Sequence, residues 1–76
     1  MTTATRVLLY TTTGCPFCEA KRQELAARGA PWREVNLSAQ PEAIAELLKL
    51  TRGRRIVPVL VDGARIEIAP GGGSAF

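Results

Sequence analysis

The chain contains two cysteines, and they stand three positions apart in the segment Thr13-Gly14-Cys15-Pro16-Phe17-Cys18. Two thiols at this spacing can cycle between a dithiol and a disulfide. Cysteine reacts as the thiolate, so the environment of each sulfur decides which one attacks. No histidine is present to serve as a general base. The chemistry that these residues indicate is thiol–disulfide exchange driven by an acidic cysteine.

The cysteine pair lies where a strand should pass into a helix. The apolar run Val7-Leu8-Leu9-Tyr10 predicts a buried strand, and residues 16–28 favour a helix. Pro16 suits the first helical turn because it fixes φ and lacks an N–H that would be unpaired there. Cys15 then faces free backbone N–H groups and the positive end of the helix dipole, which stabilise its thiolate. We predict that Cys15 attacks, that the deeper Cys18 resolves, and that Pro16 completes the catalytic motif.

Composition and length indicate one soluble globular domain. The 76 residues are 46% apolar and 22% charged, which is ordinary for such a domain. We expect residues 1–5 and the glycine-rich 70–76 to be flexible. The polar N-terminus and the short apolar run after it predict no membrane span and a cytoplasmic protein. In that reducing compartment a transient catalytic disulfide is expected rather than a structural one.

The net charge of +3 is too mild and too scattered to indicate nucleic-acid binding, but it suits a small anionic ligand. Two sulfurs supply half of a zinc shell and no histidine can complete it, so no metal is expected within one chain. Two chains together could complete such a shell.

Hydrophobic patterning predicts alternating strands and helices. The expected order is strand, helix, strand, helix, strand, strand, over residues 6–11, 16–28, 32–37, 41–53, 56–61 and 65–68. The first two strands should be parallel, and Asp62-Gly63 should turn the last two into a hairpin. Pro58 is unusual inside a buried strand, and we hypothesise a cis Val57-Pro58 bond that leaves the Val57 N–H and C=O free for a ligand backbone.

With this element order, a Cys-Pro-Phe-Cys motif, Val57-Pro58 and a later Gly-Gly, the chain resembles the glutaredoxins of the thioredoxin-fold superfamily over about residues 6–73. The resemblance implies an α/β, thioredoxin-like fold with a four-stranded mixed sheet (β-α-β-α-β-β). The family usually continues into a final helix, whereas this chain stops at Phe76, as in short bacterial glutaredoxin-like proteins. The sheet face left by that helix should be bare, covered by the tail, or buried in a homodimer, so we expect a monomer or a homodimer.

The resemblance also implies that glutathione is the co-substrate, and that disulfide-containing or glutathionylated proteins are the partners. Glutathione would pair with the Val57 backbone beside Pro58, with Phe17 next to it. Its γ-glutamyl end would meet the glycine turn, and its glycyl carboxylate would meet a basic side chain. The residues implied at these contacts are Phe17, Arg54, Val57, Pro58, Gly71, Gly72, Gly73 and Ser74.

Two other functions fit the same motif. One is a thioredoxin-like electron donor recharged by a flavin reductase. The other is an iron–sulfur or metal carrier, formed when two chains share Cys15 with external glutathione. The cluster of Arg52, Arg54 and Arg55 also has a purely structural interpretation, since basic residues complement the negative end of a helix.

Overall fold

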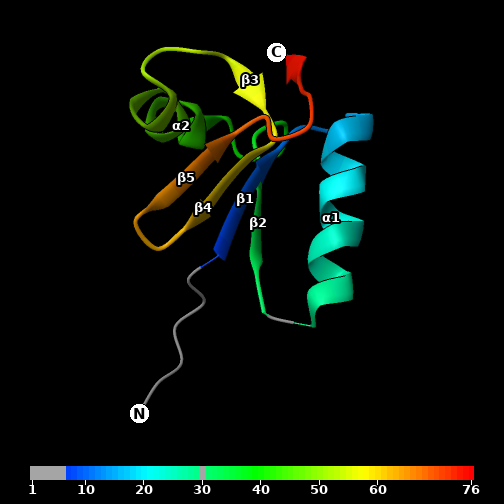
Figure 1. Ribbon diagram of the computed structural model, residues 1–76. Coiled ribbons are helices and arrows are strands. Elements are labelled where there is room, and N and C mark those ends of the chain that lie inside the picture. The colour runs from blue at the N-terminus through cyan, green and yellow to red at the C-terminus, as the bar shows by residue number, and fades with distance from the viewer. Residues whose placement is uncertain (1–6, 30) are drawn as a thin grey trace.

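A four-stranded mixed sheet in the order β2-β1-β4-β5 forms the centre of the fold (Figure 1). The computed structural model describes residues 7–29 and 31–76, so the predicted flexibility of residues 1–5 lies outside the described residues. Strand β1 (Val7–Thr11) is parallel to β2 (Arg33–Asn36) and antiparallel to β4 (Val59–Asp62), which pairs antiparallel with β5 (Arg65–Ile68). The predicted α/β, thioredoxin-like fold with a four-stranded mixed sheet is confirmed.

Two helices cover opposite faces of this sheet, as Figure 1 shows for α1 (Pro16–Arg28) and α2 (Ile44–Thr51). Successive strand residues point to opposite faces, so neighbouring residues of β1 supply two separate cores. On the α1 side Leu9 packs with Leu25 and Leu60. On the α2 side a larger cluster contains Tyr10, Leu37, Leu47, Val59, both cysteines and Val57.

The helix ends follow the sequence signals with one difference. Helix α1 ends at Gly29, which has the predicted left-handed conformation with φ of 72°. The second helix begins at Pro41 as predicted, but with a 3₁₀ turn, η1 (Pro41–Ala43), before α2. Helix α2 ends at Thr51 rather than at Gly53. The Thr51 hydroxyl bonds both the N–H and the carbonyl of Arg54, at 3.1 and 2.7 Å, and this turns the chain early.

The predicted strand over residues 56–61 is divided at Pro58. Its first part, β3 (Ile56–Val57), leaves the main sheet and pairs antiparallel with β6 (Ser74–Ala75). Proline has no N–H for a sheet ladder, so a continuous strand through this position is disfavoured. The Val57-Pro58 bond is cis, as hypothesised. The segment 70–76, expected from its composition to be flexible, contains β6, because the chain turns back onto β3 after its glycines.

The apolar sheet face expected in the absence of a final helix is not found in the described part of the chain. On the α1 side of the sheet, Leu60 is only 2% exposed. The neighbouring residue of β5 on that side is Glu67, which forms an ion pair with Arg65 at 3.4 Å. On the α2 side Ile68 packs against the core, and Ile66 is 42% exposed. Monomer or homodimer stays a prediction. Within residues 7–29 and 31–76, no helix has the length and apolarity needed to span a bilayer.

Candidate active site

Both sulfurs lie at the start of α1, where the sequence places them. Cys15 is the N-cap residue, with extended φ and ψ of −89° and 113°, and Pro16 follows at the first helical position. The Cys18 N–H donates to Cys15 Sγ at 3.3 Å. Cys15 is 6% exposed and Cys18 is fully buried, and both are free thiols. Cys15 is thus the sulfur nearer to solvent and the one that accepts from the helix terminus.

The two thiols differ in acidity because their hydrogen bonds differ. Burial alone would raise the pKa of Cys15, but hydrogen bonds from Cys18 and Ser74 side chains and from the backbone N–H groups of Cys18 and Phe17 outweigh it, and the pKa is lowered. Burial, followed by the hydrogen bond to Cys15, raises the pKa of Cys18 to about 12. Of the two thiols, Cys15 is therefore the one that loses its proton more readily.

Ser74 contacts the Cys15 sulfur directly. Strand β6 brings its Oγ to 3.5 Å from Cys15 Sγ, across 59 positions of sequence. As a thiol, Cys15 can donate to this oxygen, and as a thiolate it can only accept from the hydroxyl. Ser74 was predicted to meet the γ-glutamyl end of glutathione, and in this structure its hydroxyl lies beside the nucleophile.

Phe17 and the glycine turn adjoin each other at the rim of the site. Phe17 is 42% exposed, and a Cβ placed on Gly72 would lie 2.7 Å from its ring Cε1, so only glycine permits this approach. Gly71 is exposed on the same turn. Gly73 lies against β3, because a Cβ there would be 2.5 Å from the Val57 carbonyl oxygen. The structure therefore brings Phe17, Gly72 and Gly73 to the site.

The expectation of a free Val57 backbone is wrong for this conformation. Val57 lies opposite Ser74 in the β3–β6 pair, and the Phe76 N–H donates to the Arg55 carbonyl at 3.2 Å. Antiparallel ladders alternate hydrogen-bonded and open pairs, so the bonded Arg55–Phe76 pair makes Val57–Ser74 a bonded pair as well. The tail supplies the partner that was expected from a ligand. Pro58, next to Val57, is buried.

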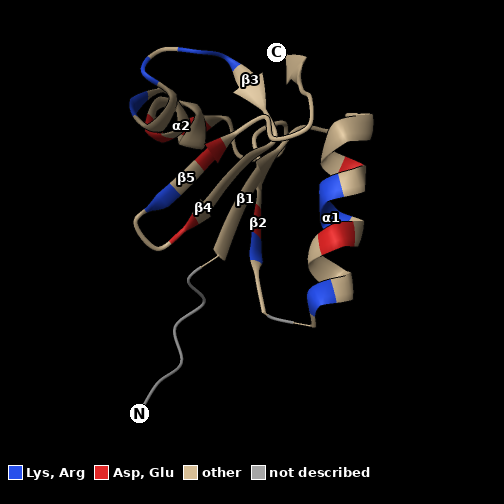
Figure 2. Cartoon of the chain, in the orientation of Figure 1, with Lys and Arg blue, Asp and Glu red and all other residues tan. Residues whose placement is uncertain are grey.

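The basic loop between α2 and β3, blue in Figure 2, holds two kinds of arginine. Arg54 is exposed, and no hydrogen bond or ion pair involves its side chain among the described residues. Arg55 instead donates from Nε to the Phe76 carbonyl at 2.9 Å, and its guanidinium carbon lies 4.8 Å from the centre of the Phe76 ring. Sequence reasoning missed this clamp, because no local pattern links residues 21 positions apart.

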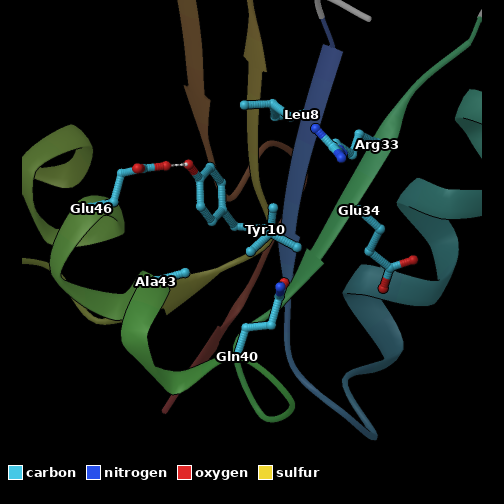
Figure 3. Close-up of a pocket in the computed structure, with 8 residues that line it drawn as sticks. Leu8, Tyr10, Arg33, Glu34, Gln40, Ala43 and Glu46 are labelled. Carbon is cyan, nitrogen blue, oxygen red and sulfur yellow. Dashed lines mark hydrogen bonds between the residues drawn. The ribbon is translucent and has the colours of Figure 1, made fainter.

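A pocket of about 380 Å³ lies away from the predicted site residues, between β1, β2 and the start of α2 (Figure 3). Tyr10 points from β1 toward α2, where its hydroxyl donates to Glu46, while Glu34 points away from Tyr10. Burial, followed by the Glu46 bond, raises the pKa of Tyr10. This pair fastens α2 to the sheet. No cluster of three potential metal ligands occurs in the described residues.

Comparisons with known proteins agree with this geometry. A glutaredoxin family model matches residues 7–66. A glutaredoxin of Pseudomonas aeruginosa is 37% identical over 57 residues, which cover 75% of this chain and 67% of that protein. A glutaredoxin of Neisseria meningitidis serogroup A is 38% identical over 58 residues, with the same coverage. No solved structure matches significantly. The chain belongs to the glutaredoxin family and is a thiol–disulfide oxidoreductase.

Proposed function

We propose that this oxidoreductase uses glutathione to reduce disulfide-containing or glutathionylated proteins, with Cys15 as nucleophile and Cys18 as resolving thiol. The observation that carries the proposal is the difference between the two sulfurs. Cys15 Sγ accepts a backbone hydrogen bond at 3.3 Å and has a lowered pKa, whereas Cys18 is fully buried and has a pKa of about 12. A thiolate is stabilised only at Cys15.

The first step is attack by the Cys15 thiolate on the glutathione sulfur of a glutathionylated protein. A new bond forms between Cys15 and glutathione, the old disulfide bond breaks, and the protein leaves as its thiolate. The thiolate of a second glutathione then attacks the glutathione sulfur of this mixed disulfide. Oxidised glutathione leaves, and the Cys15 thiolate is restored, so each turnover consumes one free glutathione, while the other half of the oxidised glutathione comes from the substrate.

Cys18 offers a second route from the same mixed disulfide. After losing its proton it attacks the Cys15 sulfur and expels glutathione as a thiolate, which gives a Cys15–Cys18 disulfide. Two further glutathiones reduce that disulfide in two exchanges. The high pKa of Cys18 keeps it protonated at neutral pH, so we expect resolution by external glutathione to compete well with the internal route.

The glutathione site is proposed beside the glycine turn. Arg54, with its exposed side chain, is the proposed partner of the glycyl carboxylate. Phe17, Gly71 and Gly72 border the space for the γ-glutamyl end. Backbone pairing with Val57, beside Pro58, requires that β6 first release this edge. We place the activity in the cytoplasm, where the glutathione pool is reducing.

The test is glutathione-dependent reduction of a glutathione mixed disulfide by wild type, Cys15→Ser and Cys18→Ser. We expect Cys15→Ser to lose turnover by at least about 10³-fold, since a serine hydroxyl without a general base is a far weaker nucleophile than a thiolate, and Cys18→Ser to retain it within about tenfold. Arg54→Gln should raise the KM for glutathione with little change in kcat.

Arg52→Gln is the matched control, because Arg52 lies in the same exposed loop but is not assigned to the site. A wild type that is inactive with glutathione, but whose Cys15 still alkylates readily at neutral pH, would rule out the glutathione site and leave the exchange chemistry intact.

A further inference from the structure

The hydroxyl of Ser74, in β6, contacts the Cys15 sulfur at the start of α1. Four groups approach the Cys15 sulfur, namely the backbone N–H groups of Phe17 and Cys18, the Cys18 thiol and the Ser74 hydroxyl. The first three come from α1 itself, whereas Ser74 comes from the last strand. Ser74 also lies beyond residues 7–66, the part that matches the glutaredoxin family model. The hydroxyl therefore reaches the sulfur from outside the helix terminus.

Strand β6 is held in place at both ends of its pairing with β3. At one end Gly73 allows the chain to pass close to the Val57 carbonyl, where a Cβ would lie 2.5 Å from the oxygen. At the other end Arg55 holds Phe76 through two hydrogen bonds, at 2.9 and 3.2 Å, and through its guanidinium over the ring. This anchoring fixes the position of Ser74 relative to Cys15.

We propose that Ser74 is a positioning residue for thiol–disulfide exchange, whose hydroxyl donates to the Cys15 thiolate and is held there by β6. The proposal rests on Cys15 being the nucleophile. Ser74 supplies one hydrogen bond to the sulfur in the free enzyme, and that bond favours the thiolate over the thiol. Removing the hydroxyl leaves the Cys18 donors in place, so the effect should be partial.

The titratable groups around Cys15 do not obscure the effect of the Ser74 hydrogen bond on the pKa of Cys15. From α1 the titratable neighbour is Cys18, which stays protonated over the range of interest. The residues of β3 and β6, namely Ile56, Val57, Ser74 and Ala75, carry no titratable side chain. Glu19, in the first turn of α1, pairs with Arg22. A change in Cys15 titration on substituting Ser74 therefore reports the lost hydroxyl.

The decisive comparison is between Ser74→Thr and Ser74→Val, which have nearly the same shape and differ in the hydroxyl. The measurement is the rate of iodoacetamide alkylation of Cys15 in the reduced protein between pH 4 and 9, with the site verified by mass spectrometry. We expect Ser74→Val to move the midpoint to higher pH and to slow alkylation roughly three- to tenfold below it. The rate at high pH should be kept, and Ser74→Thr should follow wild type.

Ala75→Ser is the matched control, since its side chain points to the other face of β6. Ala75→Ser should leave the pH profile of Cys15 alkylation unchanged, and adding it to Ser74→Val should not restore the wild-type midpoint. Equal midpoints for Ser74→Thr and Ser74→Val would overturn the proposal, as would rescue by Ala75→Ser. Because alkylation needs no glutathione, a shifted midpoint in a protein that cannot use glutathione would separate this inference from the proposed function.

Discussion

Cys15 and Cys18 lie one helical turn apart, yet their protons are held with very different strength. Cys15 Sγ lies 3.3 Å from the Cys18 backbone nitrogen and 3.5 Å from Ser74 Oγ. Cys18 is fully buried in the core on the α2 side. For Cys18 the folded state favours the neutral thiol, which raises its pKa to about 12 from an ordinary value of 9.0. Folding and the protonation of Cys18 are therefore linked.

This linkage predicts a loss of stability at alkaline pH. The folded state binds the Cys18 proton more tightly than the unfolded state does, so the contribution is full below pH 9 and is lost as pH rises toward 12. In a Cys15→Ser background, where Cys15 does not titrate, we expect the unfolding free energy to fall by about 1 kcal/mol between pH 8 and 10. Denaturant titration in the presence of reductant measures it.

The Cys15→Ser/Cys18→Ser double variant is the control, because it keeps every other titrating group. Its unfolding free energy should lack this component, so the two curves should converge as the pH rises. Parallel curves would mean that Cys18 titrates alike in the folded and unfolded chain.

At the scale of elements, β6 has two effects that oppose each other. Ser74 stabilises the thiolate, but the same strand pairs with Val57, the backbone edge that glutathione is proposed to use. Deleting residues 74–76 should therefore lower the KM for glutathione several-fold while moving Cys15 alkylation to higher pH. Steady-state kinetics and alkylation measure the two effects separately.

Arg55→Ala should also lower the KM for glutathione and move Cys15 alkylation to higher pH, but by smaller amounts than the deletion. It removes the side-chain contacts of Arg55 with Phe76 and keeps the strand. Arg52→Ala, in the same loop, should move neither. An unchanged or higher KM after the deletion would show that glutathione does not bind along the Val57 edge.

The strength of local signals explains which elements the sequence predicts. Helix α1 is bracketed by Pro16 and Gly29, and its N-terminus largely determines the different environments of the two cysteines. The polar α1-side face of β5 was also visible in the alternation of Arg65 to Ile68. Strand β6 has only two residues after a run of glycines, and its partner β3 is equally short, so no periodicity marks either. The contact of Ser74 with Cys15 depends on that pairing and was not predictable.

For the molecule as a whole, the sheet separates two hydrophobic cores, and only one of them contains active-site residues. The smaller core, Leu9, Leu25 and Leu60, joins α1 to the sheet. The larger core contains Leu47 together with Cys15, Cys18 and Val57. The packing of α2 is therefore continuous with the active site, although α2 lies across the sheet from α1 (Figure 1).

This division predicts different outcomes for two equivalent substitutions. Leu47→Val and Leu25→Val each shorten a buried leucine, 0% and 2% exposed, within a helix. Each should lower the unfolding free energy by about 1 kcal/mol, from lost burial and an incompletely filled cavity. Only Leu47→Val removes packing from the cluster that holds Cys18 and Val57, so only it should broaden or shift the pH profile of Cys15 alkylation. If Leu25→Val shifted that profile as much at equal loss of stability, general loosening of the domain, rather than the α2-side core, would control the nucleophile.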